Sequence, residues 1–290
     1  MVLAPVAAGR PGRLAFLGTP ELAVPPLRAL VAAGFEVALV VSQPDRRRGR
    51  GSTLSPSAVK AAALELGLPV TDRVDDLLEV EVDLGVVVAF GRLIRPHVLA
   101  AVPMVNLHFS QLPRWRGAAP VERAILAGDQ TTGVDLMAVE EGLDTGGIYA
   151  RAELEIGPDE TLDELRARLV EVGTTLLVEH LQRGLPAPTP QQGEPTYAAK
   201  VDPAELAIDW SAPAEQVHRV VRLGGAWTTH GGRRLKVWRT HVPPSGPGPR
   251  VAAGDGPVEL VEVQPEGKAR MAATAWANGA HWTDGDRLGS

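Results

Sequence analysis

Two residues with complementary chemistry stand two positions apart in the segment Met104–Phe109, where Asn106 carries an amide and His108 an imidazole. Residues two apart on a β-strand point to the same side, so both side chains face one space if this segment is a strand. An amide can donate a hydrogen bond to a developing oxyanion, and an imidazole can act as a general acid or base. Taken alone, the pair also fits a histidine with a purely structural role.

A carboxylate among glycines follows at Asp144, within the segment Glu141–Gly147. Acids bracketed by glycines are common turn formers, so this residue taken alone also fits a structural role. Beside His108, however, the carboxylate could orient the imidazole and favour its charged form. The chain has no cysteine and no Gly-x-Ser-x-Gly motif, so we expect the attacking atom to belong to a substrate.

Composition and spacing exclude several classes of site. The absence of cysteine rules out a disulfide scaffold, a thiolate nucleophile and a cysteine-ligated metal. The seven histidines never occur in an H-x-H or H-x-x-x-H pair, so we expect no metal site. The chain also lacks G-x-G-x-x-G and G-K-[ST] motifs, which disfavours a redox enzyme that binds a dinucleotide.

Apolar runs that predict strands alternate with amphipathic stretches that predict helices from Arg13 to about Gly184. Continuous apolar runs separated by helices are typical of a parallel sheet covered on both faces, so we expect an α/β fold with a Rossmann-like, doubly wound, mostly parallel sheet. Ligands of such sheets bind at the carboxyl ends of the strands. The predicted strands are Arg13–Gly18, Glu36–Ser42, Val82–Phe90 and Met104–Phe109, and the predicted helices are Pro20–Ala33 and Ser57–Leu66.

The longest predicted helix covers Thr161–Arg183, begins with a capping box formed by Thr161 and Glu164, and ends at Gly184. A proline-rich stretch follows, and beyond it short β-like pieces such as Arg234–Thr240 and Gly256–Val263 lie between glycine and proline turns. We therefore expect a catalytic domain over residues 1–184, a linker over 185–206, and a small OB-like β barrel over 207–290.

Charge is distributed unevenly along the chain. The formal net charge is -6, yet residues 216–254 contain no acidic residue, and Arg46, Arg47, Arg48 and Arg50 form a second basic group. Either group alone could be a solvated surface, but two of them in an acidic protein favour a phosphate-rich ligand. The longest apolar stretch is only a strand in length and residues 1–12 resemble a disordered start, so we expect a cytoplasmic protein with no membrane segment.

Eight segments spread over nearly the whole chain carry a resemblance to a known family. They are FLGTPELAVPPL (16–27), QPDRRRGRG (43–51), VVVAFG (86–91), VNLHFSQLPRWRGAAP (105–120), EEGLDTGG (140–147), IDW (208–210), LKVW (235–238) and VQPEGKARM (263–271). Together they resemble methionyl-tRNA formyltransferases, members of the 10-formyltetrahydrofolate-dependent formyltransferase superfamily. LPRWRGAAP is specific to the family, whereas Asn-x-His with a downstream Leu-Asp-Thr-Gly marks the wider superfamily.

The resemblance implies a monomer that transfers the formyl group of 10-formyltetrahydrofolate, as a co-substrate, to the methionine α-amine of initiator tRNA without a metal. It assigns catalysis to Asn106, His108 and Asp144. The residues implied in folate binding are Phe90, Gly91, Leu93, Ile94, Ser110, Gln111, Leu112 and Pro113. Those implied in tRNA binding are Arg46, Arg47, Arg48, Arg50, Arg233, Arg234 and Lys236.

The sequence departs from the family pattern at several places. Phe90 replaces a usual Tyr, Gln111 a usual Leu and Gly147 a usual Asp, and the segments Leu223–Trp227 and Val242–Arg250 are short. Two alternatives therefore stay open: formyl transfer to an amino sugar or another small amine, and a tRNA-binding module without catalysis. The basic groups argue against the first alternative, and the intact catalytic residues argue against the second.

Overall fold

A computed structural model describes residues 4, 6, 9–47, 54–283 and 286–289. The chain forms two compact units. The first comprises Met1–Pro120, Thr131–Leu154 and Arg166–Ala198, and the second comprises Val121–Gln130, Glu155–Leu165 and Ala199–Ser290. Two segments from within residues 1–184 thus belong to the second unit, whereas the domain boundaries at 184 and 207 stay a prediction from sequence.

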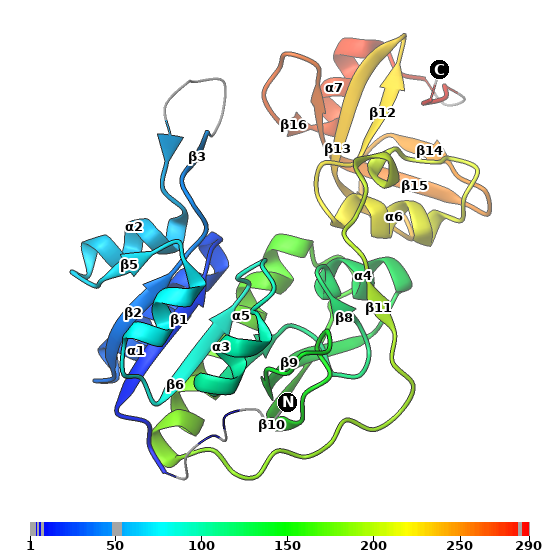
Figure 1. Cartoon of the computed structure of the whole chain (residues 1–290). Coiled ribbons are helices and arrows are strands. Elements are labelled where there is room, and N and C mark those ends of the chain that lie inside the picture. The colour runs from blue at the N-terminus through cyan, green and yellow to red at the C-terminus, as the bar shows by residue number, and fades with distance from the viewer. Residues whose placement is uncertain (1–3, 5, 7–8, 48–53, 284–285, 290) are drawn as a thin grey trace. The chain divides into compact units, whose positions relative to one another are not determined.

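The first unit is built on a seven-stranded sheet with the order β10-β9-β7-β6-β1-β2-β5 (Figure 1). The pairs β5-β2, β2-β1, β1-β6 and β6-β7 are parallel, and β7-β9 is antiparallel. The predicted mostly parallel, Rossmann-like sheet is confirmed. The strands are β1 (Arg13–Gly18), β2 (Glu36–Val41), β5 (Val70–Thr71), β6 (Leu84–Val88), β7 (Met104–His108), β9 (Thr131–Ala138) and β10 (Ile148–Glu155).

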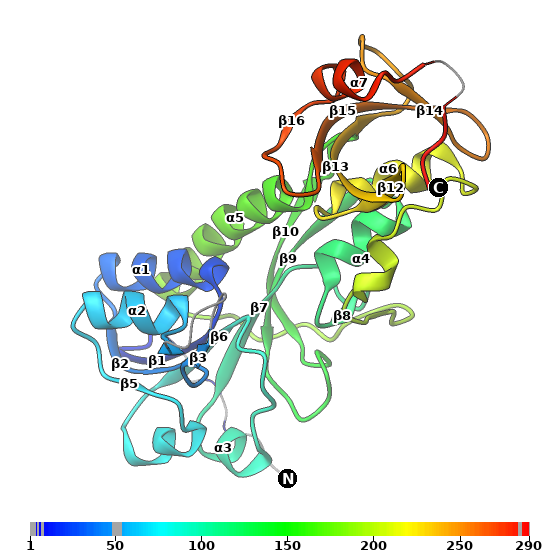
Figure 2. The ribbon, with the colours of Figure 1, turned by 90° about the horizontal axis from the view of Figure 1, so that it is seen from above.

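Helices cover both faces of this sheet (Figure 2). The helices α1 (Val24–Ala32) and α2 (Ala58–Glu65) lie on one face, and α3 (Pro96–Ala101) lies on the other. On the α3 face, buried side chains from alternate positions of the strands pack against Val98 and Leu99. The sheet is therefore doubly wound, as the alternation of apolar runs and amphipathic stretches predicted.

Local sequence explains where the predictions were slightly wrong and what they missed. The helix predicted at Pro20–Ala33 is a 3-10 turn at Glu21–Ala23 followed by α1, because two consecutive prolines stand at the start of α1. The strands β9 and β10 were not predicted. In β10 most side chains are exposed or half-buried, so this strand has no continuous apolar run.

The capping box predicted at the start of the helix α5 (Leu162–Arg183) is confirmed. The Thr161 amide donates to the Glu164 carboxylate at 2.8 Å, and the Glu164 amide lies 3.4 Å from Thr161 Oγ1. Backbone and side-chain hydrogen bonds from Thr161, together with one from Arg239, lower the pKa of Glu164 to about 2. The helix ends before Gly184, whose φ of +87° suits glycine.

The second unit contains an antiparallel sheet in the order β12-β13-β15-β14, with β16 beside β15. Its core includes Leu235, Val237, Leu260 and Trp276. The predicted small β domain at the C-terminus is confirmed. Its elements are β12 (Trp227–His230), β13 (Arg233–His241), β14 (Arg250–Ala252), β15 (Pro257–Pro265), β16 (Met271–Ala272), α6 (Ala214–Arg222) and α7 (Ala273–Ala280).

Buried polar contacts explain why residues 155–165 belong to the second unit. His218 on α6 bonds to Thr240 Oγ1 at 2.8 Å and to the Pro158 carbonyl at 3.0 Å. Burial lowers the pKa of His218, so the ring is neutral at pH 7. Arg222 donates to the carbonyls of Glu160 and Gly157 at 2.7 and 2.8 Å. Three of these contacts fix the segment before α5 onto α6, and the bond between His218 and Thr240 joins α6 to β13.

The short segment Val242–Arg250 is held by one buried carboxylate. Glu259 on β15 accepts hydrogen bonds from the amides of Ser245, Gly246 and Gly248 at 2.7–2.8 Å. Burial, the largest single effect, raises the pKa of Glu259, but the three backbone donors together outweigh it and the net shift is downward. The charged carboxylate thus replaces the strand pairing that such a short segment cannot form by itself.

We expect Glu259→Gln to lower the free energy of unfolding by about 1–3 kcal/mol at pH 7, because three backbone amides lose the charge of a buried acceptor. The lowered pKa means that this stabilisation is present above the ordinary carboxyl value of 4.5 and is lost as the pH falls below it. Urea unfolding of wild type and variant between about pH 7 and pH 3 measures the difference. Glu262→Gln on the same strand is the control, and a difference that does not shrink in acid would contradict the assignment.

Candidate active site

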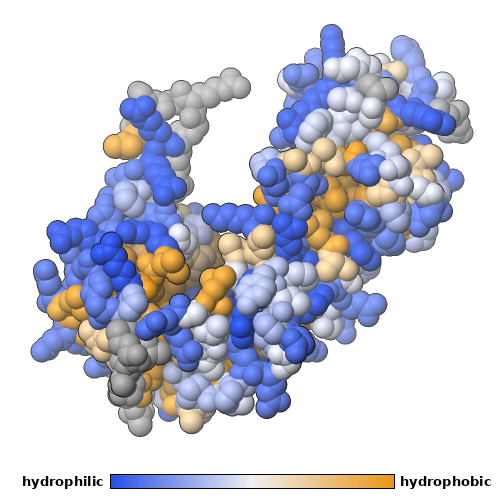
Figure 3. Space-filling view, turned by 45° about the vertical axis from the view of Figure 1, so that its right-hand side comes forward, coloured by the Kyte–Doolittle hydropathy of each residue, from blue (hydrophilic) through white to orange (hydrophobic). Residues whose placement is uncertain are grey.

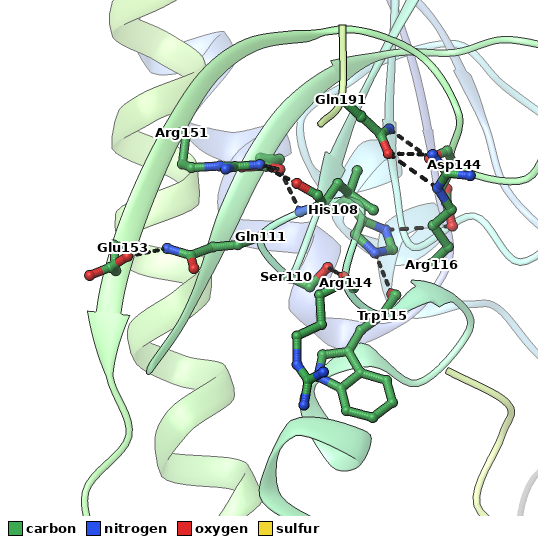
Figure 4. Close-up of polar contacts among 12 residues, drawn as sticks. His108, Ser110, Gln111, Arg114, Trp115, Arg116, Asp144, Arg151, Glu153 and Gln191 are labelled. Carbon is green, nitrogen blue, oxygen red and sulfur yellow. Dashed lines mark hydrogen bonds and ion pairs between the residues drawn. The ribbon is translucent and has the colours of Figure 1, made fainter. Parts of the chain in front are cut away.

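The structure brings His108 and Asp144 together at the carboxyl end of β7 (Figure 4). His108 is 5% exposed, and its Nδ1 lies 3.7 Å from Asp144 Oδ2. Its Nε2 lies 2.9 Å from the carbonyl oxygen of Trp115, which can only accept a hydrogen bond. Both neighbours of the ring are acceptors, so the arrangement suits an imidazolium, which donates from both nitrogens.

Asn106 lies two residues before His108 on β7 and is the one residue of that strand that is not fully buried. The strand pairs with β6 on one side and β9 on the other, which places Asn106 between Val87 and Met137. Spacing along one strand therefore puts the amide and the imidazole on the same side, as the sequence predicted.

The Asp144 carboxylate is fixed by the backbone of a neighbouring segment. Its Oδ2 accepts a hydrogen bond from the amide of Gly117 at 2.7 Å, and Asp144 itself has a φ of +51°. Gly117 lies in β8 (Arg116–Gly117), which pairs with β11 (Tyr197–Ala198). A Cβ at Gly117 would lie 3.0 Å from the Ala198 carbonyl, and its φ is +118°, so only glycine fits between the two strands.

The loop that follows β7 carries four residues that were predicted to bind folate. Ser110 and Leu112 are buried, and Ser110 Oγ donates to the Arg114 carbonyl at 2.6 Å. The side-chain amide of Gln111 donates to Glu153 on β10 at 2.6 Å. Pro113 follows Leu112 in this loop, and its carbonyl accepts from the amide of Thr196 at 3.2 Å. The loop is thus anchored to β10 and to residues near β11.

An ion pair that the sequence analysis missed fixes the same loop. Asp135 on β9 is fully buried and forms a bidentate pair with Arg151 on β10, at 2.7 and 2.6 Å. Asp135 also accepts from the Leu112 amide at 2.8 Å, and Arg151 donates to the Leu112 carbonyl at 2.6 Å. The hydrogen bond with Asp135 raises the pKa of Arg151. An acidic residue inside the apolar run GVDLMA indicated that a partner was needed, but not which one.

The other predicted folate residues lie in the loop after β6. The ring of Phe90 belongs to the core, where it packs with Val98 and Leu99, so it supports the loop from within. The carbonyl of Phe90 accepts from Thr19 Oγ1 at 2.9 Å and from Gln43 Nε2 at 3.0 Å. The rest of the loop is Gly91 with a φ of +74°, Leu93, which is 83% exposed, and half-buried Ile94.

Of the basic residues predicted after β2, Arg46 and Arg47 form β3 (Arg46–Arg47), which pairs with β4 (Leu54–Ser55). Both arginines are exposed, and hydrophilic residues dominate the surface of this hairpin (Figure 3). Arg48 and Arg50 lie outside the described residues.

The basic residues predicted on β13 lie beside two tryptophans that the sequence analysis did not assign. The Arg234 guanidinium lies 4.3 Å from the centre of the Trp227 ring, and Lys236 Nζ lies 5.5 Å from that of Trp238. The guanidinium of Arg270 also lies over the Trp238 ring, 3.3 Å from its centre. Arg233 is exposed. Alternation along β13 puts Arg234, Lys236 and Trp238 on one face, which is therefore both basic and aromatic.

Among the described residues, no group of three or more His, Asp or Glu side chains could hold a metal ion. Over the same residues, no helix is long and apolar enough to cross a membrane.

We expect Asp135→Ala to lower the free energy of unfolding by about 3 kcal/mol, because it removes one member of a buried, hydrogen-bonded ion pair. Arg151→Met should be similarly harmful, since it leaves the Asp135 carboxylate buried without a counter-charge. Urea unfolding measures both effects, with Asp72→Ala, at an exposed aspartate, as the control. If all three variants are equally stable, the pair does not hold the loop.

Family models match both parts of the chain. The model described as "Formyl transferase" matches residues 12–181, and that described as "Formyl transferase, C-terminal domain" matches residues 200–281. Among solved structures, an N-formyltransferase from Helicobacter canadensis in complex with folinic acid and dTDP-3-aminofucose is 17% identical, with a TM-score of 0.66 over 87% of this chain and 98% of that chain. At this identity the likeness shows the fold alone.

Curated relatives are much more similar. The methionyl-tRNA formyltransferase of Symbiobacterium thermophilum is 44% identical over 95% of this chain and 95% of the relative. That of Roseobacter denitrificans is 45% identical over 94% of this chain and 97% of the relative. With both formyl transferase models matched and this identity along nearly the full length of each relative, the chain belongs to the methionyl-tRNA formyltransferase family.

Proposed function

We propose that this protein transfers the formyl group of 10-formyltetrahydrofolate to the α-amine of methionine on initiator tRNA. The observation that carries the proposal is the pairing of His108 with Asp144 at the end of β7, beside Asn106, in a chain with both formyl transferase domains. The activity serves translation initiation, so we expect the protein to work in the cytoplasm. We expect it to act as a monomer.

In the proposed reaction the uncharged amine attacks the formyl carbon, and the carbonyl electrons move to oxygen. The Asn106 amide donates a hydrogen bond to the resulting oxyanion, and the positive charge of protonated His108 stabilises it electrostatically. When the intermediate collapses, the bond between the formyl carbon and N10 breaks, N10 gains a proton and the amine nitrogen loses one. Asp144 holds the imidazolium and assists this proton transfer. The step needs no metal and no nucleophile from the protein.

The formyl donor is expected to bind between the two loops that flank the end of β7. Gly91, Leu93 and Ile94 belong to the loop after β6, and the stretch from Ser110 to Pro113 follows β7. Parallel strands deliver both loops to the same edge of the sheet, which is where ligands of such folds bind. A glycine at 91 and an exposed leucine at 93 suit the close approach of a flat, largely apolar ring.

The tRNA is expected to contact the β3-β4 hairpin through Arg46 and its basic neighbours. Strand β13 adds Arg233, Arg234 and Lys236, and the neighbouring rings of Trp227 and Trp238 offer surfaces on which unpaired bases can stack. A small amine needs neither surface, which favours tRNA over an amino sugar as the acceptor. The N-formyltransferase from Helicobacter canadensis, solved in complex with dTDP-3-aminofucose, shares the fold, so the amino sugar is the acceptor to test against.

Turnover with two acceptors tests the proposal. We expect formylation of methionine-charged initiator tRNA, and little or none of dTDP-3-aminofucose, when release of tetrahydrofolate is followed. His108→Ala should reduce turnover by about 100-fold or more, because it removes the positive charge that stabilises the oxyanion. Turnover with the sugar alone would support the alternative acceptor. Full activity of His108→Ala would contradict the catalytic assignment.

Salt dependence tests the proposed tRNA surface. We expect Arg46→Ala to raise KM for tRNA and to reduce the slope of log KM against log salt concentration by about 1, because one phosphate contact is lost. KM for the folate should change little. Arg28→Ala, which removes an exposed arginine paired with Glu65 on α2, is the control. A change in folate KM with no change in the salt slope would show that the hairpin serves the folate site instead.

A further inference from the structure

The side-chain amide of Gln191 lies beside Asp144 and uses all of its hydrogen-bonding capacity there (Figure 4). Its Nε2 donates to the carbonyls of Asp144 and Gly146, at 2.8 Å each. Its Oε1 accepts from Nε and a terminal nitrogen of Arg116, at 3.1 and 2.6 Å. A glutamine amide offers two donors and two acceptor positions, so every one of them is occupied here.

These contacts act on both of the features that position the Asp144 carboxylate. The carbonyls of Asp144 and Gly146 fix the backbone of a residue whose φ of +51° is uncommon for a non-glycine residue. Arg116 precedes Gly117, whose amide holds the Asp144 carboxylate at 2.7 Å. One side chain therefore ties the strand that orients the carboxylate to the turn that carries it.

The segment that carries Gln191 is itself held in place. It lies in the stretch that the sequence analysis predicted as a linker, yet Thr189 and Ile148 exchange two backbone hydrogen bonds of 2.8 Å. Farther along, Thr196 Oγ1 accepts from the Trp115 amide at 2.8 Å. Both flanks of Gln191 are thus anchored to the first unit, so the amide is presented in a fixed position.

The glycine at position 147 also fits this arrangement. A Cβ at this position would lie 3.0 Å from Pro188 Cβ and 3.2 Å from the Thr189 carbonyl. A side chain there would press against the segment just before Gln191. The glycine at this position therefore allows this segment to pass close to the Asp144 turn.

We propose that Gln191 is a positioning residue that sets the placement of Asp144 relative to His108, so that a residue of the segment after α5 completes the active site. This inference rests on the proposed roles of Asp144 and His108. Gln191 does not touch the reacting atoms. Its loss should therefore slow the chemical step rather than weaken the binding of either substrate, since a small misplacement of a catalytic group can cost about 100-fold in rate.

The test compares three variants by kcat, by KM for 10-formyltetrahydrofolate, and by the Kd of folinic acid. We expect Gln191→Leu, which keeps the approximate size but loses four hydrogen bonds, to lower kcat by about 10- to 100-fold with KM and Kd within about threefold of wild type. Gln191→Glu still accepts from Arg116 but sets a carboxylate against two carbonyls, so kcat should fall at least as far. Gln192→Leu, at the neighbouring exposed glutamine, is the control and should keep kcat within about twofold.

A merely structural role would give a different pattern. If Gln191→Leu lowers Tm but keeps kcat at 25 °C within about twofold, or raises KM alone, the inference is wrong. Should that variant fail to fold, Arg116→Met removes the partner of the same amide and should lower kcat about three- to tenfold; an unchanged kcat there also overturns it. All variants are assayed with the amine that the wild-type protein formylates. An error in the proposed acceptor is therefore visible in the wild-type protein alone and does not affect the comparison of variants.

Discussion

The imidazole of His108 is held between two acceptors, the Trp115 carbonyl and the Asp144 carboxylate, and the polar structure around it keeps those two acceptors in place. A ring with acceptors on both sides is best satisfied when both nitrogens carry protons, and the positive charge of that form can stabilise an oxyanion nearby. Neither acceptor lies on the strand that carries His108. Their positions depend on the loop after β7 and on the turn at Asp144, and both are irregular segments that need support from outside.

That support comes from side chains that form hydrogen bonds with backbone groups in partly buried positions. Asp135 and Arg151 bind both the amide and the carbonyl of Leu112, and Gln191 binds two carbonyls of the Asp144 turn. Such contacts stabilise irregular backbone because an unpaired polar group away from water costs about 1–3 kcal/mol. Gly117 and Gly147 have the complementary role, since they let neighbouring segments approach where a Cβ would collide.

Basic residues gather on both units, at Arg46 and Arg47 in the first and on the sheet of the second. The first unit carries the residues proposed for catalysis, and the sheet of the second unit presents arginine and lysine side chains stacked on Trp227 and Trp238. The net charge of -6 is therefore an average over unlike surfaces. An acidic protein with local basic surfaces can engage one RNA while avoiding indiscriminate binding to nucleic acid.

Local patterns were enough to predict the parallel sheet, the residues of β1, the capping box at Thr161 and the shared side of Asn106 and His108, because each depends on neighbours within a few positions. Motifs along the chain were enough for the family. The tertiary structure alone decided that Asp135 pairs with Arg151, that Gln191 supports Asp144, and that residues 121–130 and 155–165 belong to the second unit. These features join polar groups 16 to more than 60 residues apart, and hydrogen bonds over such separations leave no periodicity in the sequence, because only the folded backbone brings the partners together.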